Sequence, residues 1–204
     1  MRSFLTSTLL ALSFALATPA TAKKFGFDTT ITSPLTSAVK VEVVLSEDLA
    51  YRANNLPKKL KDRNGTRGLS AGFATNGFFG ERDLELLQER LKSDLEKTFS
   101  KKGIETSDTS LTIFRVTLDD VTPNRPTFTQ RTKQPGLSYN SFAKGGAEIK
   151  AELIAPDGRS LGNMSYAWYE RDIRFAGLQG TWGDAYDAIQ RFSRRAAKSL
   201  STSR

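Results

Sequence analysis

The sequence contains neither cysteine nor histidine. Without cysteine, the chain can form no disulfide and can carry no lipid on an N-terminal cysteine. Without histidine, Ser-His-Asp and Cys-His nucleophile systems are excluded, and so are zinc sites built from these two residue types. A catalytic site would have to use carboxylates, lysine, tyrosine or a hard metal ion held by oxygen ligands.

Long apolar runs are missing after the first residues of the chain. Arg2 precedes an apolar run over Phe4–Ala17, and Ala20-Thr21-Ala22 gives the small-x-small pattern of a signal-peptidase site. The alternative, a transmembrane anchor, needs about 20 apolar residues, and this run is shorter. We therefore expect residues 1–22 to be a signal peptide that is cleaved after Ala22. The mature chain is expected to be a soluble periplasmic protein with no lipid anchor.

The mature chain is basic and of the size of one domain. Removing Arg2 from the 30 lysines and arginines leaves 29 basic side chains against 22 acidic ones, a net charge of +7. Residues 23–204 are enough for a single domain with its own hydrophobic core.

One helix is clearly indicated between Gly80 and Gly103. Apolar residues recur there at three- and four-residue spacing, which lines one helical face: Leu84, Leu87, Leu91, Leu95 and Phe99. Acidic residues fill its first turns and lysines its last, as the helix dipole favours. Gly103 followed by Ile104 predicts a Schellman-type end.

Alternating patterns predict the strands. Val39–Leu45 and Ala147–Leu153 alternate apolar with polar residues, and Pro156-Asp157-Gly158 predicts a turn that leads to a partner strand over 161–173. Apolar residues on both faces at the start of Leu111–Val121 indicate a central strand. Residues 23–37 are expected to form a short edge strand or an ordered arm.

A second amphipathic helix is expected after Thr181, which could form a capping box with Asp184. The resulting order is strand, helix, three strands, helix. We predict an α/β (α+β) two-layer sandwich in which about four mainly antiparallel strands carry both helices on one face.

Two connections stand out as candidate contact surfaces. Residues 47–80 begin with a short helix capped by Ser46 and continue as a long basic, glycine-rich connector. Residues 122–146 form a loop with basic and aromatic but no acidic residues, a composition that suits an anionic partner. The expected interaction surface draws on both: Phe73, Phe78, Phe79, Arg125, Phe128, Arg131, Lys133, Tyr139 and Lys144.

Three carboxylate pairs are candidates for general acid–base chemistry. Asp119 and Asp120 are adjacent, so on a regular strand they would point to opposite faces. The remaining pairs, Glu148 with Glu152 and Glu170 with Asp172, are also typical of a solvated strand face. We predict no catalytic, cofactor-binding or metal-binding residues.

The chain resembles a poorly characterised group of small bacterial cell-envelope proteins, domains of unknown function that include many lipoproteins. The similar features are a helix ending in Lys101-Lys102-Gly103, the strand from Leu111 into Asp120-Val121-Thr122-Pro123, and the final helix after Trp182-Gly183-Asp184. A further similar stretch runs from Gly145 to Gly158. The resemblance implies a two-layer α/β domain in the periplasm of a Gram-negative bacterium, and it supplies no catalytic residues.

The leading hypothesis is a non-catalytic envelope accessory or interaction protein whose partner is an envelope protein or an anionic lipid or polymer. The alternative is a small-ligand carrier with a pocket between the sheet and the C-terminal helix, near Tyr166, Trp168 and Trp182. A third hypothesis is a carboxylate-based hydrolase of wall or polysaccharide material. Nucleic acid is not expected as a partner, because an exported protein seldom meets it.

Overall fold

The computed structural model describes residues 26–58, 72–134, 136–176 and 178–201. The expected signal peptide and the glycine-rich part of the connector, residues 59–71, lie outside the described residues. The elements follow in the order β1 (Gly26–Thr29), β2 (Lys40–Leu45), α1 (Glu47–Tyr51), α2 (Phe73–Asn76), α3 (Glu81–Lys101), β3 (Ile113–Thr122), α4 (Phe128–Lys133), β4 (Gly146–Ile154), β5 (Ser160–Tyr169), α5 (Ile173–Ala176) and α6 (Gly183–Leu200).

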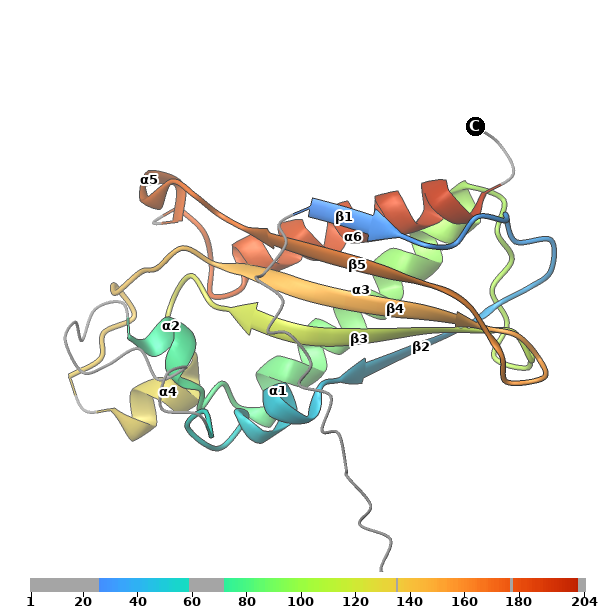
Figure 1. Cartoon of the computed structure of the whole chain (residues 1–204). Coiled ribbons are helices and arrows are strands. Elements are labelled where there is room, and N and C mark those ends of the chain that lie inside the picture. Colours follow the sequence, from blue (N-terminus) through green and yellow to red (C-terminus); the bar gives the residue numbers. More distant parts are fainter. Residues whose placement is uncertain (1–25, 59–71, 135, 177, 202–204) are drawn as a thin grey trace, which may run out of the picture.

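Five strands form one sheet in the order β1-β5-β4-β3-β2, and the two long helices α3 and α6 cover one of its faces (Figure 1). Only β2 and β3 are parallel, and α3 provides the crossover between them. This confirms the predicted two-layer α/β fold, with one strand more than expected. The additional strand is β1, an edge strand within residues 23–37 that pairs with β5.

The apolar stripe of α3 is buried as its spacing predicts. Its five apolar residues are at most 1 % exposed, and Phe99 meets Phe114 of β3 at a ring-centroid distance of 5.6 Å. Gly103 has a φ of 72°, and the amide of Ile104 donates to Phe99 O at 3.0 Å. The Schellman end of this helix is therefore confirmed. Among the described residues, no helix combines the length and apolar character needed to cross a membrane.

A bulge in β3 corrects the prediction for its acidic pair. The register against β4 shifts between Leu118 and Asp120, which places one additional residue in β3. Asp119 reaches Lys150 and Asp120 reaches Tyr169, and both partners lie on the sheet face away from the helices. The two carboxylates therefore point to the same face, where a regular strand would separate them.

The bulge also moves Val121 to the helix-covered face, where it is fully buried. Leu111 lies before β3 and is 73 % exposed. The opposite face of β3 carries Arg115, Thr117 and Asp119, so it is not apolar as expected. The strand is nevertheless central, because β2 and β4 flank it.

The start of α6 departs from the predicted capping box. The residue that precedes the helix is Trp182, without a side-chain cap, and the Asp184 carboxylate accepts hydrogen bonds from Asn124 and Gly145. Thr181 instead offers its backbone carbonyl to the amide of Asn124. The Asp184 carboxylate therefore binds residues that are distant in sequence, and it does not form the capping box that the local pattern predicts.

Candidate functional site

Two loops at one end of the sheet carry most of the expected surface residues. Residues 123–145 join β3 to β4, and residues 170–182 join β5 to α6; together we call them the loop end (Figure 1). Backbone hydrogen bonds connect the two segments. The amide of Asn124 donates to Thr181 O at 2.7 Å, and that of Glu170 donates to Gly145 O at 2.9 Å. The two segments therefore form one structural unit.

Asn124 is the buried centre of this unit. Its Nδ2 donates to the Asp184 carboxylate at 2.5 Å, and its Oδ1 accepts the amide of Asp184 at 2.8 Å. Gly145 donates its amide to the same carboxylate at 2.9 Å, and a Cβ on Gly145 would lie 2.7 Å from Asn124 Oδ1. Burial raises the pKa of Asp184 above its ordinary value, although these two hydrogen bonds act in the opposite direction. The loop end is thereby fixed to the first turn of α6.

The helix α4 is held in place by Gln130, which is fully buried. Thr127 and Gln130 form a reciprocal capping box at its start. The Nε2 of Gln130 also donates to Phe73 O at 2.6 Å and to Gly77 O at 2.8 Å. These bonds attach α4 to the segment around α2, so the exposed side of α4 has a fixed orientation.

Four of the predicted surface residues lie against one another. The Arg131 guanidinium is 5.8 Å from the Phe128 ring centroid and 5.6 Å from that of Tyr139. The Arg125 guanidinium is 5.3 Å from the Tyr139 ring and donates to Gln179 O at 2.9 Å. We call this alternating row, Phe128, Arg131, Tyr139 and Arg125, the basic–aromatic ladder. Cation–π contacts of this kind stabilise the extended arginine side chains.

The other predicted surface residues divide into exposed and buried ones. Lys133 and Lys144 are exposed, and Phe78 is partly buried with a φ of 53°. Phe73 and Phe79 are at most 1 % exposed, so they are core residues and contribute nothing to a contact surface. Phe79 packs edge-on against Trp182 at 5.8 Å. In the sequence, these phenylalanines all lie close to glycines, and this pattern does not show which of them are buried.

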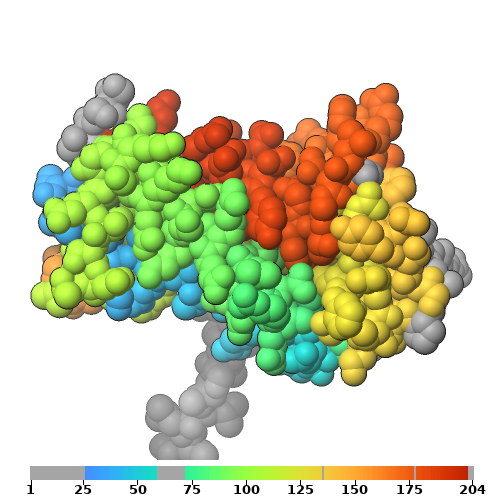
Figure 2. Space-filling model, turned by 180° about the vertical axis from the view of Figure 1, so that it is seen from behind, coloured from blue at the N-terminus to red at the C-terminus, as the bar shows by residue number. Residues whose placement is uncertain are grey.

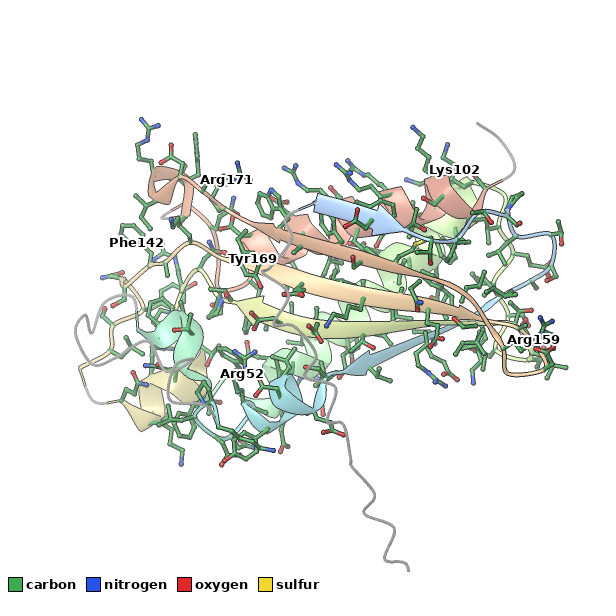
Figure 3. All side chains as sticks on the ribbon, viewed as in Figure 1. Arg52, Lys102, Phe142, Arg159, Tyr169 and Arg171 are labelled. Carbon is green, nitrogen blue, oxygen red and sulfur yellow. The ribbon has the colours of Figure 1, made fainter. Side chains whose placement is uncertain are left out.

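A cluster of polar side chains that the sequence did not reveal lies beside the loop end on the uncovered sheet face. Asp120 accepts from Arg52 at 2.5 Å and from the Tyr169 hydroxyl at 3.0 Å. Burial and the Asp120 charge raise the pKa of Tyr169 far above its ordinary value, so this phenol stays protonated. Tyr169 and Asp120 help to line a pocket of about 440 Å³, which Thr75, Thr122, Lys144, Glu170 and Arg171 complete. Figure 3 shows Tyr169, Arg171 and Phe142 at this same end.

The carboxylates considered for a hydrolase do not converge. Glu148 and Glu152 lie on the uncovered face of β4, whereas Glu170 accepts the amides of Arg171 and Asp172. Asp172 is engaged by Arg174, which holds the pKa of this carboxyl below its ordinary value. Within the described ranges, no group of three acidic side chains is placed to hold a metal ion.

The space between the sheet and α6 is filled by side chains. Tyr166 and Trp182 are 3 % and 4 % exposed, and Tyr166 packs against Phe192 at 6.4 Å between ring centroids. Arg191 lies over the partly buried Trp168 at 4.7 Å. In the part of the chain that the structure describes, these aromatic residues pack in or against the core and do not line an open pocket at this interface.

Comparisons with known proteins give structural likenesses only. No protein-family model and no curated protein matches the chain by sequence. Eight chains of known structure match. A PelC dodecamer from Paraburkholderia phytofirmans is 9 % identical, with 88 % of this chain and 99 % of that chain covered, at a TM-score of 0.40. A Xanthomonas campestris protein described as DUF330 is 10 % identical, with 81 % and 87 % covered, also at 0.40.

A minor lipoprotein from Acinetobacter baumannii is 8 % identical, with 79 % of this chain and 91 % of that chain covered, at a TM-score of 0.34. With TM-scores below 0.5, these likenesses carry no argument about this chain, and neither residues, partners nor assembly are transferred from these proteins.

Proposed function

We propose that this chain is an exported, non-catalytic interaction protein of the cell envelope that binds an anionic component through the loop end. The observation that carries this proposal is the basic–aromatic ladder. The Arg131 guanidinium lies against two aromatic rings, and that of Arg125 lies against one ring and donates to two backbone carbonyls. Because both side chains are already held, less side-chain entropy is lost when they bind an anion. The buried side chains of Asn124 and Gln130 fix the backbone on which the ladder lies.

The charge of the loop end supports an anionic partner. Residues 123–145 contain four basic side chains and no acidic one, and residues 170–182 contain two of each sign. The two acids in the second segment, Glu170 and Asp172, are already hydrogen-bonded within it. The loop end therefore presents a positive surface, and this surface attracts polyanions and anionic surfaces.

The proposed location is supported by the signal-peptide pattern of residues 1–22. The proposed non-catalytic role is supported by the carboxylates described above, which do not converge on one site. Arg2, the apolar run and the small residues before Lys23 are the features of a signal peptide. The Arg52–Asp120–Tyr169 cluster contains a phenol whose pKa is raised far above its ordinary value by burial and by the Asp120 charge. Such a phenol is not suited to exchanging a proton near neutral pH.

The experiment is capture from native envelope extract by the purified mature protein, at low and at high salt. The test variant replaces Arg125 and Arg131 by Ala, and the control replaces the exposed Arg82 and Lys97 of α3 by Ala. Both variants lose the same charge. We expect the ladder variant to lose the captured component and the control to keep it. Equal loss in both variants would refute binding through the loop end.

A small-ligand carrier remains the second candidate, and the observation that favours it is the pocket of about 440 Å³ beside Tyr169. The pocket is large enough for a small molecule. Native mass spectrometry of protein purified from the periplasm tests this function. A bound molecule that is lost in Tyr169→Ala would support a carrier, and a spectrum of the bare protein would argue against it.

A further inference from the structure

Exposed apolar side chains gather at the loop end. Of the eleven large hydrophobic side chains that are exposed among the described residues, six lie there. They come from three short pieces of chain, namely α4, the stretch before Lys144, and α5 with the residues after it. Their exposed fractions range from 45 % to 83 %: Phe128, Tyr139, Phe142, Ile173, Phe175 and Leu178. Their number at one end of the molecule marks this end as a candidate interaction site.

The apolar residues occur together with cations. Arg131 lies over Phe128 and Tyr139, and Arg174 belongs to the same short helix as Ile173 and Phe175. The loop end contains six basic and two acidic side chains, and Arg174 is paired with one of these acids, Asp172. Seen from behind in Figure 2, the gold and orange segments of the loop end form the right-hand end of the molecule.

We propose that the anionic component is a lipid bilayer, on which the loop end docks with its apolar side chains in the interfacial layer. This inference rests on the function proposed above and names the partner. The six exposed apolar side chains, which we call the apolar tips, lie on separate loops and short helices. A bilayer can bury several separate tips at once because its surface is deformable. Arginine and lysine beside these tips would lie at the level of the lipid phosphates.

The chemistry of the exposed residues favours a bilayer over a protein partner. Aromatic side chains are enriched at membrane interfaces, and basic side chains are attracted to anionic headgroups. A rigid protein partner would need a matching pocket for each tip, whereas lipid requires none. No helix in the described part of the chain can span a bilayer, so the contact would be peripheral.

The test measures binding of the purified mature protein to vesicles by co-sedimentation. One set of vesicles is phosphatidylcholine alone, and the other contains added phosphatidylglycerol. We expect binding to the anionic vesicles only. Replacing Phe128, Phe175 and Leu178 together by Ala should weaken this binding by about tenfold or more, because three apolar tips are lost. The matched control replaces Val44, Leu111 and Leu161 by Ala. These residues are exposed and apolar but lie outside the loop end, so the control should change binding less than about twofold.

A second measurement tests insertion directly. Because the chain has no cysteine, Phe142→Cys provides a unique thiol for an environment-sensitive fluorophore. We expect its emission to shift to the blue on anionic vesicles. The same label on Leu111→Cys should not shift.

Each outcome decides the inference. Equal binding of the tip variant and its control, or no emission shift at Phe142→Cys, would overturn bilayer docking. If vesicles are not bound while capture from envelope extract still depends on Arg125 and Arg131, the partner is a protein or a soluble polymer. In that case the inference fails and the proposed function stands. Both fail if neither vesicles nor extract components are bound through the loop end.

Discussion

Arg52 and Asp120 form an ion pair at 2.5 Å that joins α1 to the bulge of β3 across 68 residues of sequence. The arginine side chain is 8 % exposed, it is also paired with Asp48 at 3.0 Å, and it lies 5.3 Å from the ring of Phe79. The bulge is what turns Asp120 toward this partner. A single arginine thus connects the first helix, the central strand and the residues that precede α3.

Removal of this arginine is expected to be strongly destabilising. Arg52→Ala removes the buried arginine of the pair with Asp120, and breaking a buried ion pair costs about 3–5 kcal/mol. The measurement is the free energy of unfolding in urea. The control is Arg115→Ala, which removes a more exposed pair with Glu42 and should cost at most about 1 kcal/mol. Similar losses for the two variants would contradict the role assigned to Arg52.

The Schellman end of α3 gives a prediction about backbone conformation alone. Gly103 has a φ of 72°, and a Cβ at this position would meet no atom within 4 Å. Gly103→Ala should therefore lower the free energy of unfolding by about 1 kcal/mol, because alanine disfavours the left-handed conformation even where its Cβ makes no clash. Gly180 is equally open and lies outside the left-handed region, so Gly180→Ala should change stability by less than about 0.5 kcal/mol. Chemical denaturation of both variants tests the difference, and a neutral Gly103→Ala would contradict it.

The sequence predicted those elements that depend on nearby residues. The spacing of Leu84 to Phe99 and the Gly103-Ile104 pair are local patterns, and both gave the correct structure. The β3 bulge was not predicted because it depends on how β3 pairs with β4, far along the chain. The capping box at Thr181 failed for the same reason: Asn124, 60 residues away, takes the Asp184 carboxylate.

The candidate surface stays a prediction, but the fold brings some of its residues together. Composition alone selected Arg125, Phe128, Arg131 and Tyr139, which the fold brings into one row. It could not reveal Asn124 or Gln130, because a polar residue in a loop gives no indication that it is buried. These two residues attach the loop end to α6 and to the segment around α2, through partners distant in sequence.

The buried Asp184 predicts a pH effect. Burial raises its folded-state pKa above the ordinary value of 3.8. The folded protein therefore keeps this proton to a higher pH than the unfolded chain does. The stability contributed by the group is fully present below about pH 3.8 and is lost as the pH rises through the folded-state pKa.

Carbon-13 NMR titration of the Asp184 carboxyl measures this directly, and we expect a midpoint above 3.8. Asp184→Asn is the control, because its Oδ1 can still accept from Asn124 and Gly145. Relative to this variant, the wild-type protein should lose free energy of unfolding as the pH rises. A midpoint at or below 3.8 would show that the hydrogen bonds outweigh burial.

Gln130 connects the stability of the fold to the proposed surface. Gln130→Met keeps the size of the side chain but leaves Phe73 O and Gly77 O without their donor, which should cost about 1–3 kcal/mol. Because α4 carries Phe128 and Arg131, its displacement should also weaken capture of the anionic component under conditions where the variant remains folded. The control, Thr132→Ala, changes the exposed side of the same helix. Its free energy of unfolding should be within about 0.5 kcal/mol of the wild-type value, and its capture of the anionic component should be unchanged. If Gln130→Met lost stability and still captured its partner at full strength, the fixed orientation of α4 would be unnecessary for binding.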